Sequence, residues 1–517
     1  MRYGGITIGP IVETMFMAKK ERELWFSSYL FSWMMEDFYK YLKGNGFEII
    51  LPEFSNSTPD QNRAVGFFPD RICFGHENIE PDAAYQKIQN AYDLFLTKLC
   101  TIYSEVKNHY EKQRTTTTLD ADIKAIISGY LQVKWFVTKD SLNIEQVLCY
   151  LDNAELSIIT PNMVSEMPCD RCRTLPHTIK VRDGENKDLY LCPICAIKYG
   201  AQYAKTAVKK TGINEKNRFP SVVEIGAVEI IDEISKCSSD IEQLELIESR
   251  SNYYSYFGVL CLDVDNASKH LKRIQDNAQS VHDFSQQLFN FCSATNEIIK
   301  VFGGKTIYAG GDDILALVPI RNKYAKQGGM TILNLASEIN KVFNSIIMAE
   351  NPDSQLSVSM GVSIQYLKYP LKDALQTARH CLFNKAKETK NTISVTIRKH
   401  AGATFDFSCR MYDLEAYLEL FSAQLSKSFL QEGMYYSLAN IAPLLAEIPA
   451  ERIQFVIENY FNESGHKANA DQFKELIKFL YTLVEHVTDK NQKEQCVLNT
   501  VNLFRLAKLL EEKKEIV

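Results

Sequence analysis

The sequence has no long apolar run. Although 45% of its 517 residues are hydrophobic, no stretch approaches the roughly 20 consecutive apolar residues that a helix needs to cross a bilayer. The start of the chain, Met-Arg-Tyr-Gly-Gly, lacks the basic and then apolar layout of a secretory signal peptide. We therefore expect a cytoplasmic protein, and this length favours several domains over one.

An excess of positive charge is missing as well. The formal net charge is -6 at pH 7, so any contact with nucleic acid must come from a local basic surface. A framework of disulfide bonds is not expected either. Of the 13 cysteines, four form two Cys-x-x-Cys pairs and the other nine stand alone. This pattern is typical of reduced thiols with one metal site.

The two cysteine pairs predict a zinc site. Nineteen residues separate Cys172 from Cys192, a spacing that lets two short turns present four thiolates to Zn²⁺ in a tetrahedron. Because four cysteines leave no position for a substrate, the predicted site is structural. His177 is an alternative ligand, although a histidine in a loop needs no metal to explain it. The predicted ligands are Cys169, Cys172, Cys192 and Cys195.

The first 160 residues predict an α/β unit. Apolar residues recur at helical spacing between Ala18 and Leu42 and predict a helix with one buried face. Strands predicted on either side of this helix give a β-α-β start. The predicted strands are Ile6 to Ile11 and Phe47 to Pro52; further helices are predicted at residues 81–112 and 119–136, with an exposed loop at Lys112 to Thr118; Trp25, Trp33 and Trp135 are predicted core residues.

Residues 257–398 predict a second unit with the element order β-α-β-β-α-β, which is the order of a ferredoxin-like palm. Its hairpin turns at Gly310-Gly311. The predicted strands are 257–262, the hairpin 306–319, 356–366 and 392–398, and the predicted helices are 283–302, 331–348 and 371–387.

Changes in composition divide the chain further. Prolines and the cysteine pairs arrive together near residue 160, and a lysine-rich connector follows them. From about residue 405 onward the sequence shows only helical periodicity. The predicted domains are a first palm-like domain at 1–160, a zinc-binding module and connector at 161–218, a second palm domain at 219–402 and an α-helical domain at 403–517; the basic residues of the connector are Lys205, Lys209, Lys210, Lys216 and Arg218.

Four aspartates fall at one edge of the predicted second palm. Asp263 and Asp265 close a buried strand and, being two residues apart, point to the same side of the sheet. Asp312 and Asp313 follow the Gly-Gly turn, which leaves the backbone open to a phosphate. Carboxylates this close repel one another unless cations lie between them, so the cluster predicts two Mg²⁺ or Mn²⁺ ions. Such a pair of ions serves phosphoryl-group transfer.

Ordinary turn chemistry is the alternative interpretation of this cluster. Gly-Gly and Asp-Asp both occur in turns without any function, and Asp263 can cap a strand. The surrounding order of elements argues against that interpretation. Lys387, at the end of the last palm helix, either meets a triphosphate or is a solvated surface lysine.

Several motifs together resemble one known family. The strand Val259 to Asn266, the hairpin Tyr308 to Ile314 and the strand Leu356 to Val362 resemble the large polymerase-like subunit of type III-B (Cmr) CRISPR effector complexes. Other segments agree with this family in order and spacing, so the resemblance covers about residues 1–402. They are Thr7 to Pro10, Ala18 to Tyr29, Phe219 to Ser221, Ala386-Lys387 and His400 to Gly402.

The resemblance implies an α+β protein with two facing ferredoxin-like palm (nucleotidyl cyclase-like) domains, a zinc-ribbon insert and C-terminal helices that pack against the small helical subunit. It also implies other Cmr-type subunits, guide RNA and target RNA as partners, and an enzyme that makes a second messenger from ATP when target RNA binds. The implied site residues are Asp263, Asp312 and Asp313 for catalysis and metal binding, Asp265 less clearly, and Gly310, Gly311 and Lys387 for nucleotide binding.

Two departures from the family pattern matter. The first concerns the HD nuclease domain with which family members often begin. Here the palm starts at residue 3, and the only His-Asp pair, His282-Asp283, has no partner histidines nearby, so an HD nuclease is not expected. A Phe-Pro-Asp-Arg segment ending at Arg71 stands where the family usually has Pro-Asn-Arg. Because an acidic group disfavours a second triphosphate and favours a cation, Asp70 predicts S-adenosylmethionine as the acceptor. The alternative is that Asp70 pairs with Arg71 or another cation.

The leading hypothesis is therefore adenylation of S-adenosylmethionine by ATP with release of pyrophosphate. Some subunits of this group that lack the HD domain resemble enzymes that catalyse this reaction. Cyclic oligoadenylate made from ATP alone is the alternative product. A non-catalytic scaffold that holds RNA through Lys209 and Lys210 is an alternative of another class, and the intact Gly-Gly-Asp-Asp motif speaks against it. A diguanylate cyclase ranks lowest, because it usually carries Glu at the fourth position of the hairpin motif and has no zinc insert.

Overall fold

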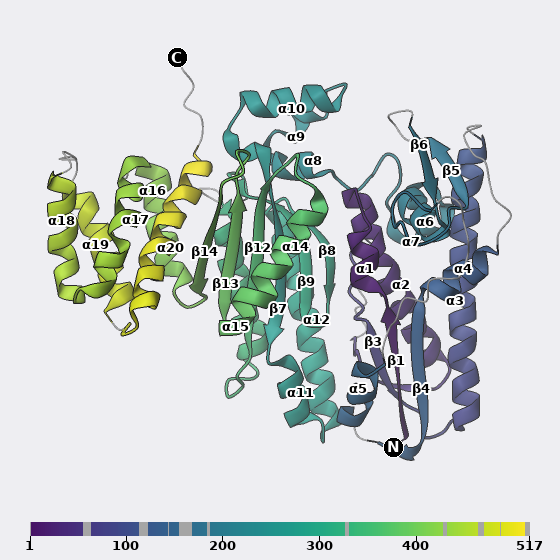
Figure 1. Ribbon diagram of the computed structural model, residues 1–517. Coiled ribbons are helices and arrows are strands. Elements are labelled where there is room, and N and C mark those ends of the chain that lie inside the picture. Colours follow the sequence, from purple (N-terminus) through teal and green to yellow (C-terminus); the bar gives the residue numbers. More distant parts are fainter. Residues whose placement is uncertain are drawn as a thin grey trace.

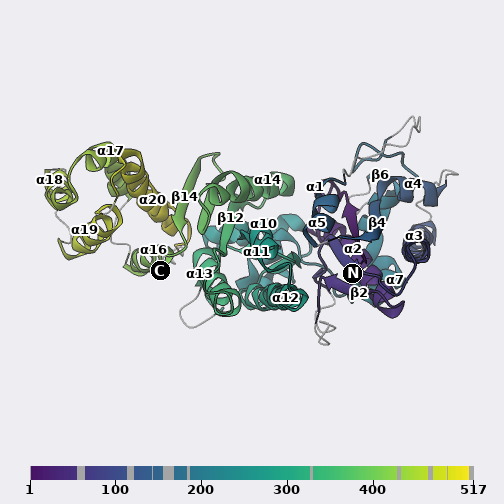
Figure 2. The same ribbon diagram turned by 90° about the horizontal axis from the view of Figure 1, so that it is seen from below.

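The computed structural model describes residues 2–54, 64–112, 122–142, 144–154, 168–182, 187–325, 330–427, 432–463, 470–485 and 487–511. The chain forms three lobes in a row, which follow one another in chain order from the purple end to the yellow end (Figures 1 and 2). Two lobes contain sheets and the third consists of helices. Among the described helices, none is both long and apolar enough to cross a membrane.

The first lobe is built on an antiparallel sheet with the strand order β2-β3-β1-β4. Ile6, at the centre of the sheet, faces Ile72 on one side and Trp135 on the other. The predicted helices at 18–42 and 81–112 are present as α2 and α3. The elements are β1 (Arg2–Gly9), α1 (Ile11–Phe16), α2 (Glu21–Gly44), β2 (Glu48–Leu51), β3 (Arg71–Gly75), α3 (Pro81–Lys112), α4 (Ile123–Tyr130), β4 (Gln132–Ser141) and α5 (Ile144–Asp152).

The helix predicted over residues 119–136 is wrong in its second half. Helix α4 ends at Tyr130, and β4 begins at Gln132 and pairs with β1. Val133, Trp135 and Val137 alternate there, and pairing with β1 overrides local helical propensity. Most of the predicted loop at Lys112 to Thr118 lies outside the described residues. The first predicted strand ends at Gly9, because Pro10 has no N–H to extend the ladder and a short helix follows.

Helix α2 is buried on all sides instead of on one face. Every residue from Glu23 to Met35 is buried, because the helix contacts α3, β2, β8 and the zinc module together. Trp25 and Trp33 are core residues, as predicted. Trp135 is only partly buried and packs between Tyr85 and Tyr92.

The second lobe contains a six-stranded sheet with the order β14-β13-β12-β7-β9-β8. The ferredoxin-like order is complete at β12; α14 then crosses over and adds β13 in parallel to β12. In Figure 2, α14 covers one face of the sheet while α12 and α13 cover the other. The main elements are β7 (Tyr256–Asp265), α11 (Ala267–Ile274), α12 (Ala278–Val301), β8 (Lys305–Gly310), β9 (Asp313–Pro319), α13 (Ile332–Phe343), β12 (Ser357–Tyr366), α14 (Leu371–Cys381), α15 (Lys387–Thr389), β13 (Thr392–Arg398) and β14 (Thr404–Arg410).

The helix that carries Lys387 passes very close to the sheet at Gly361. A Cβ atom on Gly361 would lie 2.3 Å from the backbone nitrogen of Leu382. At this point the predicted helix 371–387 changes from α14 into a π-helical turn at Leu382–Ala386 and then into α15. The predicted helix at 331–348 ends in the same way, with a π-helical turn at Asn344–Met348.

The zinc-module region and the linking elements lie between the two sheets along the chain. Strands β5 and β6 form a hairpin that leads into α6. The elements are β5 (Ile179–Arg182), β6 (Asp188–Leu191), α6 (Pro193–Gly200), α7 (Lys205–Thr211), α8 (Val222–Gly226), α9 (Ile231–Ile234) and α10 (Asp240–Ser249). A separate short hairpin, β10 (Arg321–Asn322) and β11 (Met330–Thr331), follows β9 in the second lobe.

The prediction of helices alone from about residue 405 is wrong at its start. Strand β14 occupies Thr404–Arg410, where buried residues alternate with less buried ones, as on the edge of a sheet. The helices that follow form the third lobe and pack on this strand: Asn499 exchanges two hydrogen bonds with the backbone of Ser408. They are α16 (Leu414–Lys427), α17 (Glu432–Glu447), α18 (Ile453–Glu463), α19 (Ala470–Val484) and α20 (Lys490–Leu509).

Candidate active site and zinc centre

The Gly-Gly-Asp-Asp turn joins β8 to β9 and brings three of the predicted aspartates to one edge of the sheet. Gly311 has a φ of +65°, a left-handed conformation that glycine adopts without strain. Asp313 lies directly opposite Asp263 in the β7–β9 ladder. The carbonyl of Asp312 accepts a hydrogen bond of 3.0 Å from the backbone N–H of Val264. The backbone therefore places Asp263, Asp312 and Asp313 at the same edge of the sheet, which is the position that the sequence predicted for them.

Lys387 lies against the aspartates of β7. Its ammonium group donates to the carboxylate of Asp263 and lies 3.3 Å from Asp265 Oδ1. The lysine side chain is only 21% exposed, so the surface interpretation does not hold. Burial opposes the charged form of Lys387, but the carboxylates of Asp263 and Asp265 outweigh it and raise the pKa. Because one lysine reaches both carboxylates, Asp263 and Asp265 do point to the same side of the sheet.

Asp265 has a different environment from the other three aspartates. It is fully buried, and its carboxylate accepts hydrogen bonds from the Ser357 and Ser359 hydroxyls at 2.6 and 2.8 Å and from the Asn391 N–H at 2.9 Å. With Lys387 alongside, these donors occupy the carboxylate oxygens. The hydrogen bonds thus favour a structural role for Asp265, in which it joins β7, β12 and the start of β13.

Replacing Asp265 tests this structural role. We expect Asp265→Ala to lower the free energy of unfolding by about 2–4 kcal/mol, because it leaves buried donors without an acceptor. Asp265→Asn keeps part of the acceptor capacity and should cost less. Chemical denaturation with and without Mg²⁺ measures both variants. If Asp265→Ala lowers the free energy of unfolding only when Mg²⁺ is present, Asp265 is instead a metal ligand.

The two aspartates of the turn hold protons more tightly than ordinary carboxyls. Burial, with the charge of Asp263 second, raises the pKa of Asp312 to about 6. Burial and the charge of Asp312 raise the pKa of Asp313 well above its usual value. A divalent cation would relieve this repulsion, and carboxylate oxygens are the ligands that Mg²⁺ and Mn²⁺ prefer. In this structure Asp263 is engaged by Lys387, so an ion bound by all three aspartates requires this pair to separate.

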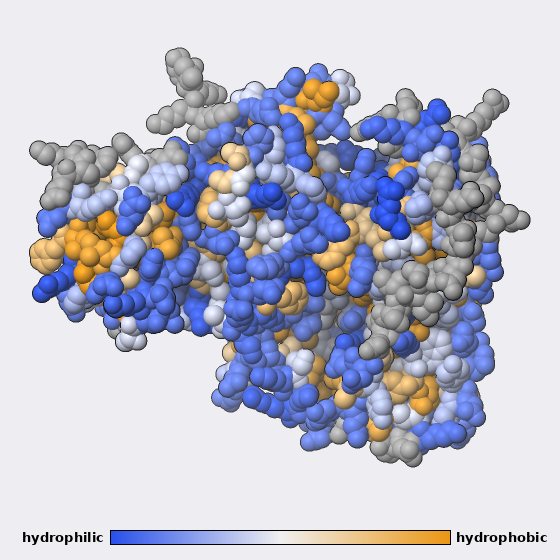
Figure 3. Space-filling model, viewed as in Figure 1, coloured by the Kyte–Doolittle hydropathy of each residue, from blue (hydrophilic) through white to orange (hydrophobic). Residues whose placement is uncertain are grey.

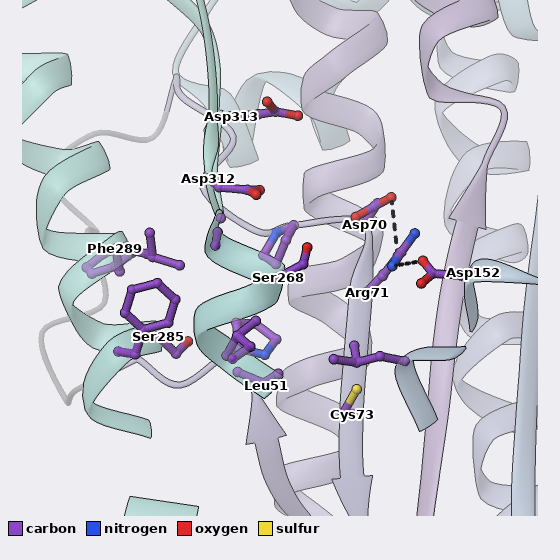
Figure 4. Close-up of a pocket in the computed structure, with 18 of the residues that line it drawn as sticks. Leu51, Asp70, Arg71, Cys73, Asp152, Ser268, Ser285, Phe289, Asp312 and Asp313 are labelled. Atoms are coloured by element: carbon purple, nitrogen blue, oxygen red, sulfur yellow. Dashed lines mark hydrogen bonds and ion pairs between the residues drawn. The ribbon is translucent and has the colours of Figure 1, made fainter. Parts of the chain in front are cut away.

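Two cavities meet at the turn, and Figure 4 shows the larger one. The larger, of about 750 Å³, lies between the two sheet lobes and has Phe54, Phe284 and Phe289 among its walls. The smaller, of about 230 Å³, lies beside α1 and α14. Both cavities are lined by Pro69, Asp70, Asp312 and Asp313. Two ligands can therefore approach the same aspartates from two sides.

Asp70 points into the larger cavity from the first lobe (Figure 4). The neighbouring Arg71 lies 2.5 Å from Asp152 but 4.0 Å from Asp70, so Asp152 is its main partner. The Asp70 side chain is 46% exposed, and its exposed surface faces the cavity. Burial by the surrounding protein nevertheless raises its pKa. The structure thus leaves the Asp70 carboxylate available to a ligand.

The sequence analysis missed three residues of the smaller cavity, Phe16, Arg379 and Phe383. The guanidinium carbon of Arg379 lies 5.0 Å from the centre of the Phe383 ring and 6.0 Å from that of Phe16. Together they offer a flat aromatic and cationic surface next to Asp313. Arg379 lies on an ordinary amphipathic helix and Phe16 comes from the other lobe, so no local pattern in the sequence marked them.

The four predicted zinc ligands lie together. Their sulfur atoms are all within 4.8 Å of one another, and among the described residues no other group of three or more His, Cys, Asp or Glu side chains is so compact. The N–H groups of Leu175 and Cys195 donate to Cys172 and Cys192 at 3.4 Å. These contacts and the all-thiol set fit a tetrahedral Zn²⁺ site. His177 instead makes an edge-to-face contact with the ring of Tyr190.

The zinc module is tied to the first lobe by buried polar contacts. Arg171, between two of the cysteines, lies 3.1 Å from Glu23 of α2, and both side chains are nearly inaccessible. Lys198 of α6 is also buried and donates to the Thr14 carbonyl of α1 at 2.8 Å. Helix α1 in turn lines the smaller cavity. The module therefore supports one wall of the candidate site.

The basic connector is partly occupied by contacts within the chain. Lys210 lies 2.5 Å from Glu36, and Arg218 lies 2.9 Å from Glu224. Lys209 is exposed. These pairings weaken the hypothesis of an RNA contact through Lys209 and Lys210.

Two facing sheet lobes with an aspartate-bearing hairpin between them define a nucleotidyl cyclase-like palm protein. Residues 3–115 match the family model for the N-terminal region of the CRISPR-associated protein Cmr2, and residues 256–394 match the second palm domain of Cas10/Cmr2. Two stretches of the chain are therefore similar to domains of Cas10/Cmr2 proteins, which confirms the resemblance found in its motifs.

Individual relatives agree with this assignment. The chain is 28% identical over 220 residues to the CRISPR system Cmr subunit Cmr2 of Pyrococcus furiosus; the match covers 41% of this chain and 24% of that protein, so it spans about a quarter of the relative's length. The structures of type III-B Cmr-beta in its apo state and bound to cognate target RNA give TM-scores of 0.59 and 0.61. Both are 12% identical and cover 89% of this chain, with 77% and 78% of theirs, which shows a shared fold.

Proposed function

We propose that this protein is a target-RNA-activated nucleotidyltransferase of a type III CRISPR antiviral complex, which joins the adenylyl group of ATP to S-adenosylmethionine. The observation that carries this proposal is the pair of cavities that share Pro69, Asp70, Asp312 and Asp313. A transferase with two different substrates needs two binding spaces that meet at its reactive groups.

The proposed reaction is the attack of the acceptor's ribose 3′-hydroxyl on the α-phosphorus of ATP. A new oxygen–phosphorus bond forms, the bond to the β-phosphate breaks, pyrophosphate leaves with its electron pair, and the hydroxyl proton passes to solvent. Asp263, Asp312 and Asp313 would hold two Mg²⁺ or Mn²⁺ ions, which in such sites activate the hydroxyl and stabilise the leaving group. Of the two glycines proposed for nucleotide binding, Gly311 leaves the backbone of the turn open to phosphate oxygens, since only Pro69 lies near it, whereas the ring of Tyr308 covers Gly310.

Asp70 and Lys387 would have complementary tasks in this scheme. Asp70 presents an acidic group to the larger cavity, where it suits the sulfonium and ammonium groups of S-adenosylmethionine. If Asp263 held a cation, Lys387 would lose this partner, and its ammonium would be available to a triphosphate. The adenine ring of ATP fits the surface formed by Arg379 and Phe383 in the smaller cavity.

The wider assembly belongs to the same proposal. By analogy with Cmr2 we propose other Cmr-type subunits, guide RNA and target RNA as partners, a structural Zn²⁺ in the four-cysteine site and a cytoplasmic location. The helical lobe carries exposed apolar side chains, including Leu444 and Phe455, and an apolar patch is visible on it in Figure 3. Such a patch suits the small helical subunit.

The test is to assemble the chain with its Cmr-type partner subunits, guide RNA and target RNA. ATP and Mg²⁺ are then supplied with and without S-adenosylmethionine, and products are identified by mass. An adenylyl conjugate that needs both S-adenosylmethionine and target RNA supports the proposal. If oligoadenylates form from ATP alone, the acceptor is a second ATP molecule and not S-adenosylmethionine. If no mixture gives a product, the result favours the alternative of a non-catalytic scaffold.

Replacing Asp70 by asparagine tests the choice of acceptor. The change keeps the size of the side chain and removes its charge, so we expect the KM for S-adenosylmethionine to rise by about 10-fold or more while the KM for ATP changes little. Initial rates at varied concentrations of each substrate measure the two constants. Unchanged product and unchanged KM for S-adenosylmethionine would show that Asp70 does not bind the acceptor. Asp82→Asn is the matched control and should leave both constants unchanged, because Asp82 is an exposed aspartate of the same lobe that lines neither cavity.

A further inference from the structure

A short segment of the first lobe, residues Ala64–Asp70, crosses to the second lobe and ends in the candidate site. We call it the strap. One side of the strap is fixed to helix α2. The indole N–H of Trp25 donates to the Ala64 carbonyl at 2.5 Å, and the Phe68 N–H donates to the Ser32 hydroxyl oxygen at 2.8 Å. Trp25 and Ser32 are buried, so these hydrogen bonds are shielded from water.

The other side of the strap pairs with the strand that leads into the catalytic turn. Gly66 forms an isolated parallel bridge with Tyr308 of β8, and its carbonyl accepts a hydrogen bond of 3.1 Å from the Ala309 N–H. The turn begins at the next residue, Gly310, whose carbonyl accepts from the Tyr308 hydroxyl at 3.0 Å. The strap therefore adds one paired residue to the edge of the second sheet, directly before the Gly-Gly-Asp-Asp turn.

The end of the strap carries the residues that line both cavities. The Asp70 carbonyl accepts from the Ile8 N–H at 3.2 Å, which returns the chain to the first sheet. Pro69 is the nearest group to Gly311, at 3.7 Å from where a Cβ atom would stand. The strap thus contacts β8 at Gly66 and lies beside the turn at Pro69, and Asp70 follows immediately.

Gly66 fits between α2 and β8 only because it has no side chain. A Cβ atom on Gly66 would lie 2.7 Å from the Cβ and 3.0 Å from the hydroxyl oxygen of Ser32. Contacts under 3.0 Å between such atoms force one of the two elements to move. Since α2 is buried on all sides, the strap is the element that must shift, and it can shift only toward β8 and the turn.

We propose that Ser32 and Gly66 are positioning residues that fix the distance between Asp70 and the Asp312-Asp313 turn. They set how the acceptor in the larger cavity meets the α-phosphate of ATP. This inference rests on the proposed function for its kinetic consequence, but its structural part, the hold of the strap on β8, does not depend on any substrate. A displacement of about 1 Å between reacting groups lowers rates by about 100-fold.

Four variants of the full assembled complex test the proposal. Gly66→Ala introduces the clash, and Gly66→Ala combined with Ser32→Gly removes the atoms it meets. Ser32→Ala removes only the hydrogen bond to Phe68. Gly44→Ala, at the end of the same helix, is the matched control, because a Cβ atom there meets nothing within 4 Å. Each variant is measured by hydrogen exchange without substrates and by initial rates with ATP and S-adenosylmethionine.

We expect Gly66→Ala to speed exchange in the peptide containing Ala309 and to lower kcat/KM for S-adenosylmethionine by about 100-fold. The double variant should restore protection at Ala309 but not at Phe68, and it should recover most of the rate. Ser32→Ala should speed exchange only at Phe68, and Gly44→Ala should match the wild type. Wild-type exchange at Ala309 in Gly66→Ala, or a loss that Ser32→Gly does not reverse, would overturn the proposal. A wild-type complex that forms no conjugate would overturn the proposed function instead, and the exchange results would still decide the role of the strap.

Discussion

Asp312→Asn combined with Asp313→Asn is expected to reduce product formation by at least about 1,000-fold, the largest effect of any change considered for this protein. Asparagine keeps the size of each side chain but removes the negative charge with which the proposed site would hold divalent cations. The backbone contacts of the turn, including the hydrogen bond from Val264 to Asp312, do not depend on the side chains. Product formation by the assembled complex, followed by mass, measures the effect. Asp353→Asn, an exposed aspartate of the same lobe, is the control.

The same double variant should not be less stable than the wild type in the absence of metal. Burial, together with Asp263, raises the pKa of Asp312 from 3.8 to about 6, so the folded state binds a proton that the unfolded state has lost between these values. The free energy of unfolding therefore falls as pH rises from about 4 to about 6. Since asparagine does not titrate, the variant does not undergo this loss of stability. Its melting temperature at pH 7 should therefore equal or exceed that of the wild type. A clearly lower melting temperature would mean that the lost activity reflects misfolding.

Loss of the zinc ligands is expected to give the largest loss of stability. Binding of structural Zn²⁺ contributes about 10–16 kcal/mol in small zinc modules, so Cys169→Ser combined with Cys172→Ser should lower the melting temperature by about 10 °C or more. The loss should spread beyond the module, because Arg171 and Lys198 tie it to α2 and α1. Native mass spectrometry for bound zinc and a thermal melt measure both parts.

A matched pair of cysteines outside the cluster controls for the chemical change. Cys100→Ser with Cys237→Ser alters two partly buried thiols that have no part in the four-sulfur group. This pair should shift the melting temperature by only a few degrees. If the wild-type protein contains no zinc and all four cluster thiols are freely alkylated, the zinc assignment is wrong.

The sequence was most informative where function depends on residues close together in the chain. The spacing of the four cysteines predicted a cluster that the structure contains. The two-residue separation of Asp263 and Asp265 predicted that they share one side of the sheet, and Lys387 touches both. The alternation of side chains along a strand shows which carboxylates share a side of the sheet, but it does not distinguish a metal ligand from a structural carboxylate. The serine hydroxyls around Asp265 come from β12, and their position became visible only with the strand register.

The features that the sequence did not predict depend on contacts between distant segments. Strand β4 looks helical by local pattern and becomes a strand because β1 offers a free edge. The strap has no periodicity of its own and is defined by its contacts with α2 and β8. For Asp70, the sequence left open a pairing with Arg71, and the choice depends on Asp152, which lies 81 residues further along. Each of these outcomes was decided by tertiary packing, which overrides local propensity.

The contact between Asn499 and Ser408 has a consequence for the whole six-stranded sheet. An outer strand presents unsatisfied N–H and C=O groups that invite another chain to add a strand, the first step of aggregation. The Asn499 amide both donates to and accepts from Ser408, and Asn502 donates to the Asp406 carbonyl, so these side chains act as substitutes for a neighbouring strand. At the opposite edge of the sheet, on β8, the Gly66 carbonyl accepts a hydrogen bond from the Ala309 N–H and satisfies that group in the same way. Removal of the helical lobe would therefore expose the unpaired groups of this edge, and a truncated chain should aggregate even though the aspartates of the Gly-Gly-Asp-Asp turn remain in place.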